Sequence, residues 1–330
     1  MIVVLSAGAL ATVQDLGRSG SLNLGVGWSG AMDPLALAAG NILLRNEENA
    51  AAIEIPVFPF RVRFARSTVF AVTGADCAPR LDDVPVLPWW AQRAEAGQVL
   101  SLSVPKTATW QASRAYLCVA GGIEVPLVLG SRSTQLRGAF GGHEGRPLQD
   151  GDTVPIADPG RRPRSSFGLV PPGLVLACEA DGLAAVRVLP AAEYECFTPA
   201  SHDALWSTPW KITPQSNRYG YRLAGDELKP VRPLELRSHG IVPGVIQVPH
   251  GGQPIIQMRD AQPSGGYPKI GTVIEADLWR LGQAPIGSSI RFVQCSWDQA
   301  LDARAETRRW LKNARRLVEL HCSQGGGGDD

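Results

Sequence analysis

The stretch LRSHGIVPGVIQVPHGGQPIIQMRDAQPSGGYPKIG (236–271) sets the pattern that most of the chain follows. It contains two short apolar runs, GVIQVP (244–249) and PIIQM (254–258), each bounded by glycine and proline. Apolar runs of this length between turn residues are typical of β-strands, whereas helices need longer periodic segments. The stretch therefore predicts short strands joined by tight turns.

The same arrangement recurs along the 330 residues. Further runs of strand length are TVFAVTG (68–74), QVLSLSV (98–104), RAYLCVAGG (114–122), VRVLP (186–190) and SIRFV (289–293). The chain also holds 36 glycines and 26 prolines, enough to supply a turn between each pair of strands. This pattern predicts a mainly β fold, organised as a sandwich or barrel.

Two segments have helical spacing instead. In MDPLALAAGNILL (32–44), Asp33 stands at the capping position and Pro34 in the first turn. In the amphipathic segment 296–320, Ser296 and Gln299 have the spacing of a capping box. We expect a short helix near the N-terminus and a C-terminal helix, followed by a mobile tail over residues 323–330.

A cluster of proline, glycine and arginine in DPGRRPRSSFGLVPPG (158–173) predicts a linker between two halves. We expect an N-terminal domain over residues 1–165. The C-terminal domain would then cover 166–330 and include the long helix.

Composition excludes several classes of protein. A net charge of +1 gives no strong field for nucleic acid or an anionic membrane surface. The apolar runs end well before membrane-spanning length, and the N-terminus lacks the basic region of a signal peptide. Six cysteines have neither CxxC nor zinc-site spacing. We expect a cytoplasmic protein with reduced thiols that binds no metal, nucleic acid or membrane.

The sequence lacks the familiar motifs of self-contained catalysis. It has no P-loop, no GxSxG, no HExxH and no lysine-bearing loop for biotin attachment. Polar side chains gather instead in residues 212–271. The candidate catalytic residues are Arg218, His250, Asp260 and Lys269, and the candidate substrate- or phosphate-binding residues are Ser216, Asn217, Arg222, Gln247, Gln253 and Tyr267.

Each candidate has a functional and a structural interpretation. Arg218 and Arg222 suit bidentate contacts to a carboxylate or phosphate, or an ion pair that supports the barrel. Lys269 is a point-charge phosphate binder or a solvated turn residue. His250 and Asp260 suit acid–base chemistry, but a turn contact explains each equally simply.

Seven segments in order resemble one family. They are TVQDLGRSG (12–20), GAMD (30–33), GGIEVPLVLGSRST (121–134), GGHEGRPLQDGD (141–152), NRYGYRLAG (217–225), SHGIVPGVIQVPHGGQPI (238–255) and DAQPSGGYPKIGTVIEADLWRLGQ (260–283). Together they resemble the C-type component of 5-oxoprolinase, the PxpC/KipA family, once described as allophanate hydrolase subunit 2 or biotin-dependent carboxyltransferase. Pro263 departs from the family pattern and removes one backbone N–H.

The resemblance implies two cyclophilin-like β-barrel domains with a few short helices. It also implies ATP-dependent hydrolysis of 5-oxo-L-proline to L-glutamate together with two 5-oxoprolinase partners, a KipI-type (B-type) component and an A-type component. ATP would be bound by this chain or by its partners, and we expect no covalent biotin here and no activity from the chain alone. Two alternatives stay open: a biotin-dependent carboxyltransferase component acting on urea or allophanate, and a non-catalytic regulator that binds a kinase-inhibitor-like partner.

Overall fold

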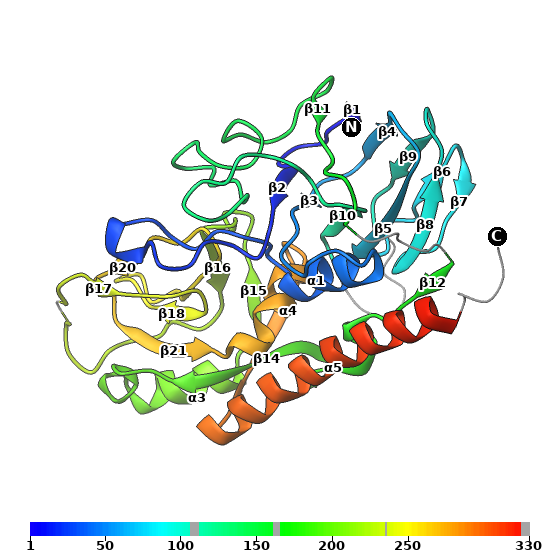
Figure 1. The fold of residues 1–330 in the computed structure, drawn as a ribbon. Coiled ribbons are helices and arrows are strands. Elements are labelled where there is room, and N and C mark those ends of the chain that lie inside the picture. The colour runs from blue at the N-terminus through cyan, green and yellow to red at the C-terminus, as the bar shows by residue number, and fades with distance from the viewer. Residues whose placement is uncertain (106–111, 161–165, 235, 325–330) are drawn as a thin grey trace. The chain divides into compact units, whose positions relative to one another are not determined.

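A computed structural model describes residues 1–105, 112–160, 166–234 and 236–324 (Figure 1). The middle of the predicted linker and residues 325–330 of the predicted tail therefore lie outside the described residues. The chain forms two compact units. Unit 1 comprises Met1–Arg18, Ser29–Val175 and Arg308–Asp330, and unit 2 comprises Ser19–Trp28 and Leu176–Thr307.

Unit 1 is built on two six-stranded sheets. The first has the order β11 (Thr153–Val154), β1 (Ile2–Ser6), β4 (Phe60–Phe64), β9 (Val99–Leu102), β6 (Arg80–Leu81) and β7 (Val84–Pro85). The second has the order β12 (Phe167–Gly168), β8 (Trp90–Ala94), β5 (Thr68–Gly74), β10 (Ala115–Val119), β3 (Ala52–Ile55) and β2 (Thr12–Gln14). Buried and exposed residues alternate strictly along β4, so one face of the first sheet covers the core.

Helix α1 (Pro34–Leu43) confirms the predicted N-terminal helix and its cap. The Asp33 carboxylate accepts a hydrogen bond from the Ala36 N–H at 2.9 Å. The helix is buried along almost its whole length and lies against β5 and β10, where the Thr73 hydroxyl donates to the Ala36 carbonyl at 2.7 Å. A Cβ at Gly40 would lie 2.5 Å from the Cys118 Sγ, so glycine permits this close packing.

Unit 2 is a closed barrel of seven strands. Around the ring run β14 (Leu183–Pro190), β21 (Lys269–Val273), β18 (Val245–Gln247), β19 (Ile255–Gln257), β16 (Gly220–Ala224), β15 (Trp210–Ile212) and β22 (Ser289–Gln294). A parallel pairing of β14 with β22 closes the ring. All the other pairings within the ring are antiparallel. Closure leaves no unpaired barrel edge, and the prediction of a mainly β, barrel-containing fold is confirmed.

Several short strands and helices lie outside the barrel ring. Strand β13 (Glu179–Ala180) pairs with β14, and β17 (His239–Gly240) forms a separate ribbon with β20 (Ser264–Gly265). The short helices of this unit are η1 (Leu22–Leu24), η2 (Tyr194–Cys196), α3 (Pro199–Ser207), η3 (Glu275–Asp277) and α4 (Leu278–Gln283). A short helix α2 (Pro172–Val175) ends the central segment of unit 1.

The C-terminal helix α5 (Trp297–Gln324) is also where the sequence predicts it. Its capping box is complete, because the Ser296 N–H donates to Gln299 Oε1 at 2.8 Å and the Gln299 N–H donates to Ser296 Oγ at 3.2 Å. Neither α5 nor any other described helix combines the length and apolar character needed to cross a bilayer.

A buried charge ties the barrel to its α4 segment. Asp277 is fully buried and accepts hydrogen bonds from Arg187 Nη2 at 2.7 Å and Arg280 Nε at 3.0 Å. Burial alone raises the pKa of Asp277, but the hydrogen bonds and charges of the two arginines outweigh it and hold that pKa below its ordinary value. The carboxylate therefore stays ionised and fixes α4 beside β14.

In unit 1, the ion pair of Arg146 and Asp152 gives a pH prediction. Arg146 donates to both Asp152 oxygens, at 2.7 and 3.0 Å, and these bonds lower the pKa of Asp152 to about 2. A depressed folded-state pKa stabilises the fold above the ordinary pKa, and this stabilisation is lost as pH falls through the folded value. Asp152→Asn should reduce the free energy of unfolding by about 1–2 kcal/mol at pH 6.

The difference in free energy of unfolding between wild type and Asp152→Asn should shrink as pH falls from 5 to 2. Urea unfolding measured at several pH values across that range tests this. Asp158→Asn is the control, since the Asp158 side chain is 91% exposed in its pair with Arg66 and should contribute little at any pH. A difference for Asp152→Asn that stays constant down to pH 2 would contradict the assignment.

Candidate functional site

The register of the barrel brings predicted residues from separate segments into one row. Arg222 pairs with Ile255, Ile255 with Gln247, and Gln247 with Lys269 across β16, β19, β18 and β21, with a register shift between Ile246 and Gln247. Register partners project to the same face of a sheet. Since the alternate residues of β16, β18 and β19 are buried in the barrel interior, this row faces outward.

Arg218 and Asp260 form a buried ion pair. Arg218 lies two residues before the start of β16, and Asp260 lies three residues after the end of β19. Arg218 Nε donates to Asp260 Oδ2 at 2.9 Å, and Nη2 donates to Oδ1 at 3.0 Å. The Asp260 N–H also donates to the Arg218 carbonyl at 2.9 Å. The structure thus contains the barrel-supporting ion pair that was the alternative to substrate binding, while a catalytic role for either residue stays a prediction.

Lys269 lies in a second charged group, with Glu193 and His239. Its Nζ is 3.1 Å from Glu193 Oε2, and its backbone N–H donates to the same oxygen at 3.0 Å. Nζ also contacts His239 Nε2. Because His239 Nδ1 lies 3.0 Å from the Arg237 carbonyl, Nδ1 carries the proton and Nε2 accepts from the ammonium. The charge of Lys269 is therefore balanced by Glu193.

Glu193 is a residue that sequence reasoning missed. It lies 76 positions before Lys269 in a segment without a recognisable motif, so only the tertiary fold reveals it. His239 stands in the stretch 236–271 but outside the candidate set. Its place on the β17–β20 ribbon explains how it reaches Lys269.

Gln247, Tyr267 and His250 lie near this group with different exposures. Gln247 is buried, where its Nε2 donates to the Tyr267 carbonyl at 3.2 Å and its Oε1 accepts from Gln257 at 2.9 Å. A Cβ at Gly265 would lie 2.7 Å from Gln247 Nε2, which explains the glycine. The exposed Tyr267 ring meets the His250 ring edge-on, with centroids 6.2 Å apart. Gln247 thus supports the loop that presents Tyr267.

The other polar candidates hold their own loops in shape. Ser216 Oγ accepts from the Arg222 N–H at 2.9 Å, and Asn217 Oδ1 accepts from the Tyr219 N–H at 2.8 Å. Gln253 Oε1 accepts from the Gly225 N–H at 2.9 Å. The three side chains therefore position the segments around Arg222.

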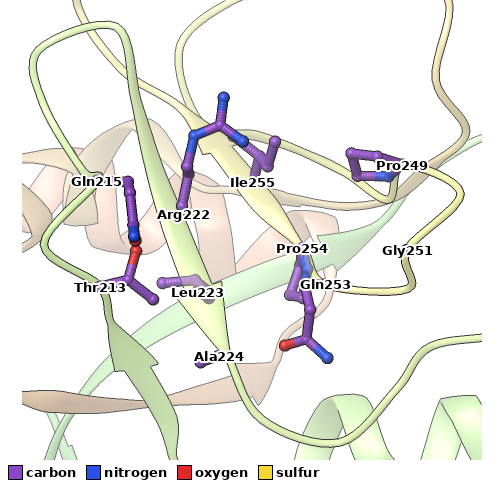
Figure 2. A pocket seen from close by; sticks show the side chains of 10 residues that line it. All are labelled: Thr213, Gln215, Arg222, Leu223, Ala224, Pro249, Gly251, Gln253, Pro254 and Ile255. Atoms are coloured by element: carbon purple, nitrogen blue, oxygen red, sulfur yellow. The ribbon is translucent and has the colours of Figure 1, made fainter.

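Those segments surround a cavity of about 460 Å³ beside β16 and β19 (Figure 2). Its lining is Thr213, Gln215, Arg222, Leu223, Ala224, Pro249, Gly251, Gln253, Pro254 and Ile255. The Thr213 hydroxyl, also missed by sequence reasoning, is buried and makes no hydrogen bond within the described part of the chain. Figure 2 shows the Arg222 side chain extending from β16 past Ile255.

Charge compensation separates the three basic candidates. Arg218 faces Asp260, and Lys269 faces Glu193. Arg222 is exposed, and across residues 1–105, 112–160, 166–234 and 236–324 no carboxylate forms an ion pair with it. Arg222 is therefore the candidate best suited to neutralise an incoming anion. Within the same ranges, no group of three or more His, Cys, Asp and Glu side chains is arranged to hold a metal ion.

Comparisons with known proteins point in one direction. The family model described as carboxyltransferase domain, subdomain A and B, matches residues 24–294. The C-type component of 5-oxoprolinase from Escherichia coli is 46% identical over 318 residues, covering 94% of this chain and 97% of that protein. The corresponding protein of Haemophilus influenzae is 43% identical, covering 97% of this chain and 99% of its own length.

The structural neighbours are parts of larger proteins. The crystal structure of Kluyveromyces lactis urea amidolyase has a TM-score of 0.85 and 29% identity, and the match covers 95% of this chain but 20% of that one. The urea amidolyase of Lachancea kluyveri is 33% identical, with 90% of this chain matching 17% of that protein. The chain is thus similar to whole proteins of one kind and to one portion of another.

Breaking the Arg218–Asp260 pair should be strongly destabilising. Arg218→Met is expected to lower the free energy of unfolding by about 3–5 kcal/mol, because it leaves a buried carboxylate uncompensated. The double variant Arg218→Met/Asp260→Leu should lose much less than the sum of the single changes. The coupling energy of this double-mutant cycle is measured by urea unfolding of the wild type, Arg218→Met, Asp260→Leu and the double variant.

The control is Lys229→Met, which breaks an exposed pair with Glu227 and should cost less than about 1 kcal/mol. If Arg218→Met cost no more than Lys229→Met, the structural role given to the buried pair would be wrong.

Proposed function

We propose a function from the premise that this chain belongs to the family of C-type 5-oxoprolinase components, within the carboxyltransferase domain family of subdomains A and B. The chain is a component of a 5-oxoprolinase built from several different polypeptides. The observation that carries this conclusion is the identity of 46% and 43% over nearly the full length of two curated C-type proteins. The urea amidolyase relative, at 33% identity, matches over 17% of its length.

We infer that this chain acts with an A-type component and a KipI-type (B-type) component. Together they hydrolyse 5-oxo-L-proline to L-glutamate while ATP is converted to ADP and phosphate. The six cysteines, all unpaired, support a cytoplasmic location for this complex.

The coupling to ATP follows from the chemistry of the lactam. Its ring amide is a poor electrophile, and its nitrogen is a poor leaving group. ATP supplies the phosphoryl group that activates the lactam oxygen. Water then adds to the ring carbon, the C–N bond breaks as the nitrogen takes a proton, and a second water hydrolyses the resulting acyl phosphate to the carboxylate and free phosphate. Such a reaction depends mainly on positioning and on stabilisation of negative charge.

Two groups of this chain suit that task. Lys269 directs two of its N–H bonds at Glu193 and His239, so the third can orient an oxygen of the substrate or phosphoryl group. Arg222 suits neutralisation of a carboxylate or phosphate because no ion pair consumes its charge in the described residues. We assign ATP to the assembled complex, with Lys269 as the residue of this chain that fits its phosphate oxygens.

The carboxyltransferase alternative rests on the family model and on the urea amidolyase neighbour. It fits less well, since the relatives named for urea chemistry are more distant than the two C-type 5-oxoprolinase proteins. Bicarbonate-dependent carboxylation of urea that avidin abolishes would favour it.

Reconstitution tests the proposal. The full chain is purified alone and with its A-type and B-type partners, and formation of glutamate and ADP from 5-oxo-L-proline and ATP is measured. We expect turnover from the complete mixture and none from the chain alone. A stable complex without turnover would contradict the proposal and favour a regulatory role, and turnover by the chain alone would contradict the need for partners.

Within the reconstituted complex, Lys269→Met should reduce turnover by about 10²–10³-fold, because it removes a positioned charge and keeps the apolar stem. Assembly, followed by size-exclusion chromatography, should be unchanged. Lys229→Met is the matched control, since Lys229 is exposed and its partner is Glu227. Normal turnover in Lys269→Met would remove this lysine from the proposed machinery.

A further inference from the structure

The cavity beside β16 and β19 has an uneven distribution of charge. Arg222 contributes a full positive charge, and none of the ten lining residues is Asp or Glu. The guanidinium forms no ion pair within the described ranges of the chain, whereas Arg218 and Lys269 each have a carboxylate within about 3 Å. An uncompensated guanidinium at a cavity attracts an anion and can bind both oxygens of a carboxylate.

The rest of the lining is suited to a compact, mostly apolar body. Leu223, Pro249, Pro254 and Ile255 contribute aliphatic surface. The volume of about 460 Å³ falls in the range of roughly 300–1,000 Å³ that is usual for small-molecule sites. A ligand much smaller than this would leave space for water or for a partner's side chain.

Thr213 and Gln215 differ in what they offer a ligand. The Thr213 hydroxyl is shielded from water and has no hydrogen-bond partner among the described residues. Gln215 lies beside it in the lining, as Figure 2 shows, and carries both a donor and an acceptor. Gln215 therefore suits a neutral amide, which also has one donor and one acceptor, whereas the shielded Thr213 hydroxyl is out of reach of a ligand.

We propose that this cavity binds a small monocarboxylate that carries a neutral ring amide, with the carboxylate on Arg222 and the amide on Gln215. The inference rests on the proposed function in one respect, since 5-oxo-L-proline has this chemistry. It assigns recognition of the substrate carboxylate to this chain and to Arg222, leaving Arg218 in its buried pair.

The same lining selects against amino acids. An α-ammonium group entering the cavity would lose water and find no carboxylate in the lining to replace it. L-Proline has a similar ring but an ammonium nitrogen, so it should bind at least tenfold more weakly than 5-oxo-L-proline. 2-Pyrrolidone keeps the lactam but lacks the carboxylate, and it should also bind at least tenfold more weakly.

Calorimetric titration of the full chain with these three compounds tests the proposal. Arg222→Gln should weaken binding of 5-oxo-L-proline at least tenfold, and Gln215→Leu should weaken it several-fold. Since Arg222 is exposed, its replacement should leave the melting temperature unchanged. Arg63→Gln is the matched control, because Arg63 is also an exposed strand arginine, on β4 of unit 1, and binding should be unaffected.

Three results would overturn the proposal: no heat of binding with the wild-type chain, equal affinity in Arg222→Gln, or equal affinity for 2-pyrrolidone. Each can be separated from failure of the proposed function. If turnover by the complex is unchanged in Arg222→Gln, the proposed binding site is wrong but the proposed enzyme activity still holds. Conversely, if the chain binds 5-oxo-L-proline selectively but the complete complex shows no turnover, the proposed binding site is supported and the proposed enzyme activity is contradicted.

Discussion

The parallel pairing of β14 with β22 is the constraint on which the candidate site depends. It closes the seven-stranded ring of unit 2 and thereby fixes the register of every strand within it. A slip of one residue would turn each side chain to the opposite face of its strand. Closure therefore decides that Arg222, Ile255, Gln247 and Lys269 share the outer face and that their neighbours fill the interior.

Within that frame, pairing of charges decides what each basic residue can do. A guanidinium already held by a buried carboxylate cannot neutralise a ligand without breaking the pair, which is costly in a medium of low polarity. Arg218, whose partner Asp260 is buried, therefore differs from the exposed Arg222 on the strand that follows it. Lys269 is intermediate, since Glu193 balances its charge but leaves it partly accessible.

Much of the fold could be predicted from local sequence. Apolar runs between turn residues located strands such as β5 and β22, and side chains three positions apart located the caps at Asp33 and Ser296. The candidate site was harder to predict, because its pairings are non-local. Sequence identified Arg218 and Asp260 but not their mutual contact, and it held no signal for Glu193. The unsatisfied Thr213 hydroxyl is a property of packing, which no spacing rule reports.

Arg222, rather than Arg218, is the residue that we propose to bind the substrate carboxylate. NMR spectra of the arginine Nε–H groups, recorded while 5-oxo-L-proline is added to the full chain, test it most directly once both signals are assigned by substitution. We expect the Arg222 signal to shift in proportion to occupancy while that of Arg218 keeps its position. A shift of the Arg218 signal with an unchanged Arg222 signal would show that Arg222 does not bind the carboxylate.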